Sequence, residues 1–208
     1  MHIVIAGNIG AGKTTLTKML AKHYNWQPHF ENVDDNPYLD DFYRDMTRWS
    51  FNLQIFFLKK RFQQIIDIKK SDKTIIQDRS IYEDAHIFAP NLYEMGLMSP
   101  RDFQNYKELF ELISSLVPPP DLLIYLKAEV PTLVKQIAMR GREYEKNISI
   151  EYLQKLNTKY NKWIKEYDRS KHITINIDNL DFINNPEDFG YIIQKIDTEL
   201  NNLFTITQ

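Results

Sequence analysis

The clearest chemical signal in the sequence is a glycine-rich segment close to its start. Residues 7–14 read Gly-Asn-Ile-Gly-Ala-Gly-Lys-Thr and fit the pattern G-x-x-x-x-G-K-[ST], between an expected strand at 3–6 and an expected helix at 13–23. Glycines allow main-chain amides to wrap phosphate groups, and the first turn of a helix adds partial positive charge. The segment therefore predicts a nucleoside triphosphate site formed by Gly7, Asn8, Ile9, Gly10, Ala11, Gly12, Lys13, Thr14 and Thr15.

Four polar side chains are expected to work together at this site. Lys13 should reach the β- and γ-phosphates, and the Thr14 hydroxyl should be a ligand of Mg²⁺. Asp78 and Arg79 follow the second expected strand, and ligands of open α/β sheets lie at the carboxyl ends of the strands. Asp78 can therefore help to hold Mg²⁺, while Arg79 can bind a phosphate or a 5′-oxygen.

A second group of side chains could bind an acceptor molecule. Gln54 and Arg61 are seven residues apart and share one face of an aromatic-rich helix expected at 48–70. An amide and a guanidinium on this face could read the edge of a nucleobase, but a core-capping amide and a solvated arginine explain the pattern equally well. Asp84 could pair with Arg61 across a pocket, with Phe88 stacking on a ring.

Two loops add further candidates. Glu31 has apolar flanks and could accept a proton from an attacking hydroxyl, although the sequence alone favours a solvated loop carboxylate. Arg140 and Arg142 flank Gly141 at the start of a charged loop. This arrangement predicts a lid at about 140–148 that closes over a transferred phosphate, or a helix C-terminus with its glycine cap, and both can hold.

The order of elements predicts the fold class. Strands are expected at 3–6, 74–78, 122–126 and 173–177, and helices at 13–23, 36–43, 48–70, 131–140, 150–167 and 186–204, with two more beginning at Ser80 and Ser99. Ser80 and Glu83 fit a capping box, which is how Glu83 is interpreted. Alternating strands and helices predict an α/β fold, with a parallel sheet of about five strands covered by helices on both faces, in a single domain over 1–208.

The composition excludes several classes of protein. The chain has 208 residues, a net charge of −2 and no cysteine, which excludes disulfide scaffolds, zinc–thiolate sites, iron–sulfur clusters and cysteine nucleophiles. The charge balance predicts no nucleic-acid or membrane partner, and without a signal peptide or spanning segment a cytoplasmic location is expected. A GTPase should carry N-K-x-D, which is absent, and a motor ATPase should be larger. A small-molecule kinase is therefore favoured.

Taken together and in order, these motifs resemble the deoxynucleoside kinases. The resemblance runs nearly end to end. It covers the glycine-rich segment at 7–14, called the phosphate loop below, residues 48–54, residues 78–82, Ile87-Phe88-Ala89, Arg140-Gly141-Arg142 and Glu151-Tyr152-Leu153. It implies a P-loop fold with an arginine-containing lid, and ATP-dependent transfer of a γ-phosphoryl group to the 5′-hydroxyl of a deoxynucleoside in nucleotide salvage. It also implies Mg²⁺ as cofactor and a homodimer. Residues 36–39 resemble the bacterial purine branch of the family.

The resemblance also assigns roles to matching positions. Glu31 matches the carboxylate that accepts the 5′-hydroxyl proton, and Tyr43 and Glu145 match the pair that binds the 3′-hydroxyl. Gln54 matches the residue that reads the base edge, and Phe88 matches the ring that stacks on the base. The remaining matches are Asp78 with Arg79 after the strand, the lid arginines Arg140 and Arg142, and a donor-adenine loop at 178–186.

The preferred acceptor stays open at this point. An Arg61–Asp84 pair resembles the deoxyadenosine, deoxyguanosine and deoxycytidine enzymes, and deoxyadenosine is favoured, with a multisubstrate enzyme as a further alternative. A nucleoside monophosphate kinase is a further alternative, but it needs additional positively charged side chains to bind the acceptor phosphate. This chain would have the carboxylate of Glu31 at that place. A non-catalytic nucleotide-binding module should lack both the base and the lid arginines.

Glu31→Gln tests the role of the expected base. Because an amide cannot take up the 5′-hydroxyl proton, kcat should fall by roughly 10²–10⁴-fold while the Kd of the deoxynucleoside changes little. Steady-state kinetics and equilibrium titration of the variant check this expectation. If nucleoside binding is lost while the rate at saturation survives, Glu31 positions the substrate and takes no proton.

Overall fold

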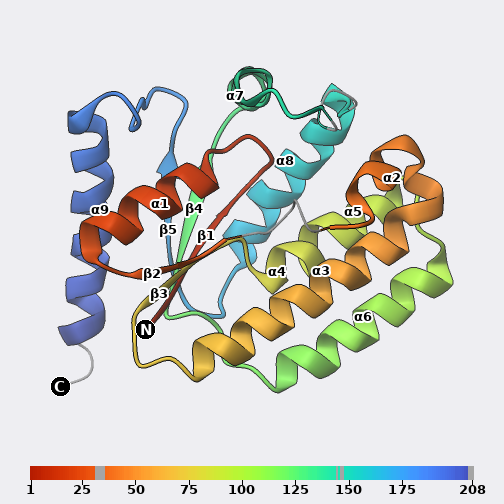
Figure 1. Ribbon diagram of the computed structural model, residues 1–208, viewed down its shortest axis with the longest axis horizontal. Coiled ribbons are helices and arrows are strands. Elements are labelled where there is room, and N and C mark those ends of the chain that lie inside the picture. Colours follow the sequence, from red (N-terminus) through yellow and green to blue (C-terminus); the bar gives the residue numbers. More distant parts are fainter. Residues whose placement is uncertain (31–35, 144, 146–147, 206–208) are drawn as a thin grey trace.

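A sheet of five parallel strands forms the centre of the molecule, as the alternation of strands and helices predicts (Figure 1). The computed structural model describes residues 1–30, 36–143, 145 and 148–205. In sheet order β2-β3-β1-β4-β5, the strands span Gln27–His29, Ile75–Asp78, His2–Gly7, Leu122–Lys127 and Lys171–Asn176. β1 pairs with β3 in a register that places Ile5 opposite Asp78. The carboxyl ends of these two strands therefore meet at one edge of the sheet.

The helices pack on both faces of this sheet. They are α1 (Lys13–Tyr24), α2 (Leu39–Arg44), α3 (Met46–Lys69), α4 (Ile81–Glu83), the π-helical turn η1 (Asp84–Phe88), α5 (Ala89–Glu94), α6 (Pro100–Ser115), α7 (Val130–Arg140), α8 (Ile150–Glu166) and α9 (Pro186–Thr205). Within the described residues, no helix is both long enough and apolar enough to cross a membrane.

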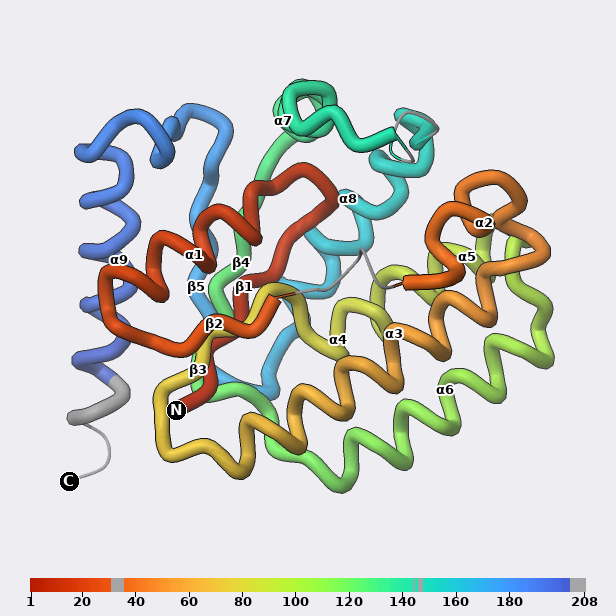
Figure 2. The backbone as a smooth tube through the Cα atoms, viewed as in Figure 1, coloured from red at the N-terminus to blue at the C-terminus, as the bar shows by residue number. Residues whose placement is uncertain are grey.

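Alternation along β1 divides the core into two layers. Ile3 and Ile5 pack into the cluster formed with α1 and α9, whereas Val4 and Ala6 pack into the cluster formed with α3, α6 and α8. Successive side chains of a strand point to opposite faces, so a strand covered on both faces must be apolar throughout. Figure 2 shows the consequence, with α1 and α9 on one side of the sheet and α3, α4 and α6 on the other.

Three elements differ from the sequence-based expectation in kind or by more than two residues at one end. β2 was not predicted, because it has three residues and contains Pro28, which suits only a short edge strand. The helix expected from Asn36 begins at Leu39, since the Asn36 side chain instead accepts a hydrogen bond from the Tyr38 amide at 3.0 Å and closes a turn. The helix expected from Ser80 is interrupted by η1, which inserts one extra residue per turn.

A chain of side-chain hydrogen bonds connects strands β1 and β3 through α3 to the loop that follows β2. His2 Nε2 lies 2.8 Å from Gln77 Oε1, Gln77 Nε2 donates to Gln64 Oε1 at 2.9 Å, and Gln64 Nε2 donates to the Phe30 carbonyl at 2.9 Å. Burial lowers the pKa of His2, which keeps the imidazole neutral in this chain of amides. The backbone immediately before Glu31 is thus held against α3.

Candidate active site

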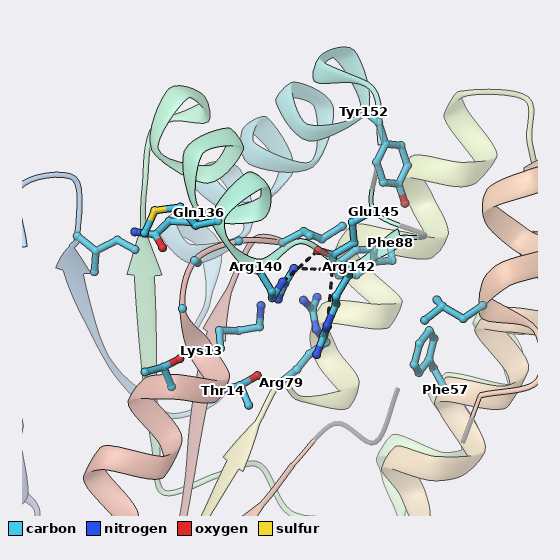
Figure 3. Close-up of a pocket in the computed structure, with 18 of the residues that line it drawn as sticks. Lys13, Thr14, Phe57, Arg79, Phe88, Gln136, Arg140, Arg142, Glu145 and Tyr152 are labelled. Atoms are coloured by element: carbon cyan, nitrogen blue, oxygen red, sulfur yellow. Dashed lines mark hydrogen bonds and ion pairs between the residues drawn. The ribbon is translucent and has the colours of Figure 1, made fainter. Parts of the chain in front are cut away.

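A cavity of about 490 Å³ opens at the carboxyl ends of β1 and β3 (Figure 3). The phosphate loop forms its floor from Ile9 to Thr15, and α2, α3, η1, α7 and the segment after β5 form its walls. The cavity is lined by most of the site residues that the sequence predicts: Lys13, Thr14, Tyr43, Gln54, Arg79, Asp84, Phe88, Arg140, Arg142 and Glu145. Glu31 lies outside the described residues.

The phosphate loop depends on glycine at two positions. Gly10 and Gly12 have φ angles of 86° and 78°, in the left-handed region that glycine adopts without strain. A Cβ at Gly10 would lie 2.7 Å from the Leu133 carbonyl of α7, so the loop and this helix are in close contact. Lys13 Nζ donates to the Asn8 carbonyl at 3.0 Å, which places the ammonium within the loop.

Asn8 joins the loop to the rest of the fold. Its Nδ2 donates to the Leu153 carbonyl and to Asn157 Oδ1 of α8, both at 3.2 Å, and Asn157 in turn donates to the Ala128 carbonyl at 3.0 Å. Gly7 and Asn8, the first two residues of the loop, are not among the described residues that line the cavity. The sequence places Asn8 in the phosphate site, where main-chain amides wrap the phosphates, and its side chain bonds to α8 and to the Ile9 amide and so fixes the position of the loop.

Thr14 and Asp78 come together where a metal ion is expected. Thr14 Oγ1 donates to Asp78 Oδ2 at 2.5 Å, and the Asp78 side chain is buried. Asp78 Oδ1 is also buried and has no hydrogen-bond partner among the described residues. A hydroxyl and a carboxylate with an unused oxygen are the ligands that Mg²⁺ prefers, so the pair fits this cation.

Arg79 adopts an unusual backbone conformation directly after β3. Its φ angle is 68°, a left-handed conformation that costs a non-glycine residue about 1–2 kcal/mol. The Arg79 amide donates to the Ile5 carbonyl at 3.0 Å, and the guanidinium carbon lies 4.5 Å from the centre of the Phe88 ring. The turn therefore directs a buried arginine from the strand end toward the cavity.

The polar residues expected at the base-binding end separate into two layers. Gln54 and Asp84 line the cavity, and Gln54 Oε1 is buried without a hydrogen-bond partner among the described residues. Arg61 is 2% exposed and is not among the described residues that line the cavity. Its Nε donates to Asp84 Oδ2 and its Nη1 to the Asp78 carbonyl, both at 3.3 Å.

This geometry corrects one of the two sequence-based interpretations of Arg61. The side chain is not a solvated helix residue, because it is buried and paired with Asp84. The contact of Arg61 with a nucleobase stays a prediction. The expected Arg61–Asp84 ion pair does form. Pairing compensates the charge of each group in a buried environment, where an unpaired charge would be costly.

Apolar residues to which the sequence assigns no binding role complete the same wall. They are Leu39, Phe42, Leu53, Phe57 and Tyr152. Four of the five carry only apolar side chains and are indistinguishable in sequence from core residues. The Phe88 ring lies among them and contacts Tyr160 edge-on, with 6.4 Å between ring centres. This end of the cavity is thus a slot between aromatic rings with Gln54 and Asp84 at its polar edge.

Glu145 pairs with Arg140, the last residue of α7, and with Arg142 in the loop that follows, and all three line the cavity. Arg140 donates to both carboxylate oxygens, from Nε at 3.0 Å and from Nη2 at 2.5 Å, and Arg142 Nη1 lies 3.6 Å from Glu145 Oε1. Glu145 is buried, whereas each arginine side chain keeps about a third of its surface exposed. In Figure 3, four cationic side chains converge on one region of the cavity: Lys13, Arg79, Arg140 and Arg142.

The opposite end of the cavity is formed by residues 177–183, with Gln136 and Met139 of α7 beside them. Phe182 packs on the phosphate loop, because a Cβ on Gly12 would lie 3.1 Å from its ring. Asp178 holds this segment to α7 by accepting from the Glu129 amide at 2.8 Å and from the Thr132 hydroxyl at 2.7 Å. Part of the loop expected at 178–186 therefore lies against the phosphate loop, while Gln136 and Met139 gave no signal in the sequence.

Comparison with known proteins agrees with this geometry. A family model described as deoxynucleoside kinase matches residues 3–201. A deoxyadenosine/deoxycytidine kinase of Bacillus subtilis is 40% identical over 93% of this chain and 90% of its own length, and a deoxyadenosine kinase of Dictyostelium discoideum is 44% identical over 81% and 68%. A solved deoxyadenosine kinase from M. mycoides superposes with a TM-score of 0.85 at 29% identity, over 95% of this chain and all of its own. The chain belongs to the deoxynucleoside kinase family.

Proposed function

We propose that this enzyme transfers the γ-phosphoryl group of ATP to the 5′-hydroxyl of a deoxynucleoside, with deoxyadenosine as the preferred acceptor. The observation that carries the proposal is the single cavity that joins a phosphate loop to an aromatic slot edged by Gln54 and Asp84. Donor and acceptor bound at these two ends would meet at the converging cations. Phosphoryl transfer needs such positioning and charge stabilisation more than it needs covalent chemistry by the protein.

The residues of the cavity divide the reaction between them. Main-chain amides of the phosphate loop and the Lys13 ammonium bind the donor phosphates. The guanidinium groups of Arg79, Arg140 and Arg142 stabilise the transferring group. As the 5′-oxygen forms its bond to the γ-phosphorus, its proton passes to Glu31 and ADP leaves with the electrons of the broken P–O bond. Thr14 and Asp78 would hold Mg²⁺, which when bound neutralises phosphate charge.

The polar edge of the slot supports an adenine base. The Gln54 amide can accept from the adenine N6 amino group while donating to a ring nitrogen, a pairing that geometry favours. The Asp84 carboxylate can accept a further hydrogen from an exocyclic amino group, which adenine, cytosine and guanine all carry. The names of the Bacillus and Dictyostelium relatives support deoxyadenosine first, with deoxycytidine or deoxyguanosine as alternatives.

A phosphoryl-transfer assay with a panel of acceptors tests the proposal. With ATP and Mg²⁺, deoxyadenosine should give the highest kcat/KM among the four deoxynucleosides, and deoxynucleoside monophosphates should give no turnover. Lys13→Ala is the matched inactive control, since it removes the phosphate-binding ammonium while the loop glycines remain. Turnover of monophosphates but not of nucleosides would contradict the proposed acceptor.

The buried ion pair is expected to set the choice of base. Arg61→Met leaves Asp84 without this partner beside the cavity, and breaking a buried pair costs about 3–5 kcal/mol. The single change should therefore reduce kcat/KM for deoxyadenosine more than the double change Arg61→Met with Asp84→Ala does. The double variant also opens space beside Phe88, which should admit the methyl group of thymidine.

Measurement of kcat/KM for deoxyadenosine and thymidine across both single variants and the double variant checks this prediction. Lys60→Met, on the exposed face of the same helix, is the matched control and should leave both values unchanged. An unaltered ratio of the two substrates in the double variant would show that specificity lies elsewhere in the slot.

We also propose that the enzyme is a homodimer that associates through α6. Leu109 and Leu112 lie on one face of this helix and Leu116 follows at its C-terminal end, and they are 38%, 63% and 60% exposed in the single chain. Light scattering should give twice the chain mass of 24.8 kDa. Leu112→Glu should shift the protein toward the monomer, whereas Tyr191→Glu on α9 should not. A monomeric wild-type protein would contradict this proposal.

A further inference from the structure

Glu83 is a buried carboxylate whose contacts exceed what helix capping requires. Its Oε2 accepts from the Ser80 amide at 2.8 Å, which completes the capping box expected from the sequence. Its Oε1 points the other way and accepts from the Gly7 amide at 3.2 Å and from the Tyr160 hydroxyl at 2.8 Å. One side chain with 0% exposure therefore connects the end of β1, the start of α4 and the middle of α8.

Tyr160 extends this connection to Arg79. Its hydroxyl accepts from Arg79 Nη1 at 3.0 Å while donating to Glu83, and the Tyr160 side chain is fully buried. Burial raises the pKa of the Tyr160 phenol well above its usual range, so the hydroxyl keeps the proton that it donates. Arg79 Nη1 also lies 3.9 Å from Glu83 Oε1, close enough for direct charge compensation.

The backbone of Arg79 is strained, so its conformation depends on the contacts that surround it. Arg79 is one of two described residues other than glycine with a positive φ angle, and Asn25, the other, is a residue type that tolerates this conformation. A strained backbone persists only where the surrounding contacts fix it. Hydrogen bonding to Tyr160 on one side and stacking on Phe88 on the other define the direction of the guanidinium.

We propose that Glu83 and Tyr160 form a buried positioning pair that aims Arg79 at the transferring phosphoryl group and couples it to the phosphate loop through the Gly7 amide. This inference rests on the proposed function, in which Arg79 stabilises that group. A capping role alone would use only Oε2, whereas the second oxygen is committed to the phosphate loop and to the hydroxyl that holds Arg79. Neither residue lines the cavity, so both act through Arg79.

Tyr160→Phe removes the bridging hydroxyl and leaves the ring in place. Loss of a hydrogen bond to a charged group should lower kcat about 10-fold or more, while the KM values for ATP and deoxynucleoside stay within about twofold. Tyr125→Phe is the matched control. The Tyr125 ring is also buried and stacks on Tyr160 with 5.8 Å between ring centres, but its hydroxyl donates to Asn161 at 3.3 Å, away from Arg79.

A double-mutant cycle with Arg79→Ala separates positioning from general stability. If Tyr160 acts through Arg79, Tyr160→Phe has no further effect on kcat once the guanidinium is absent. Thermal unfolding should show both variants folded at the assay temperature, with the larger loss of Tm in Tyr160→Phe, because its hydroxyl bridges two buried charged groups. An equal fall in kcat in both backgrounds, or an equal fall in the Tyr125→Phe control, would overturn the proposal.

Crystal structures of the two tyrosine variants provide a readout that needs no activity. In Tyr160→Phe the Arg79 guanidinium should leave its place over the Phe88 ring, and in Tyr125→Phe it should stay. An unmoved guanidinium in Tyr160→Phe overturns the positioning role even if the enzyme is an active kinase. An inactive wild-type protein, in contrast, refutes the proposed function and leaves this structural test to decide the pair.

Discussion

The parallel pairing of β1 with β3 is the constraint on which the site depends. Because Ile5 lies opposite Asp78, the phosphate loop and Arg79 leave the sheet side by side at its carboxyl edge. The Arg79 amide then bonds to the Ile5 carbonyl, and Thr14 reaches Asp78 across the same gap. A shift of one residue in this register would turn every side chain of one strand to the opposite face and separate these groups.

Two buried ion pairs lie beside the cavity. Arg79 with Glu83 lies at the end where we propose that phosphate binds, and Arg61 with Asp84 lies at the end proposed for the base. In each pair one member lines the cavity and the other lies behind it. This arrangement presents one charge to a ligand while its partner offsets the cost of keeping that charge away from water. The adjacent positions of Glu83 and Asp84 place both pairs at the start of η1.

The sequence reveals those parts of the site that follow from local rules. The phosphate loop needs glycines and a lysine at fixed spacing, and the Arg61–Asp84 contact could be expected from two charges on neighbouring helices. The sequence does not predict that Asp84 lines the cavity while Arg61 lies behind it, because the spacing of residues along a helix does not tell which member of a pair reaches the cavity. Phe57 and its apolar neighbours cannot be told from core residues by their sequence pattern. The capping box accounts for Glu83 in the sequence and gives no sign of its contacts with Gly7 and Tyr160. β2 lacks any signal, since its three residues are ordered by pairing with β3.

The π-helical turn η1 separates the residues beside the phosphate loop from the residues that line the slot. Asp84 and Phe88 are its first and last residues, whereas Arg79 and Glu83 precede it on the strand end and the first helical turn. Removing the extra residue of such a turn would restore a regular helix and rotate the residues after the turn relative to those before it. Gain or loss of one residue here would therefore turn Phe88 relative to Asp84 and reshape the slot, while Arg79 and Glu83, which precede the turn, keep their places.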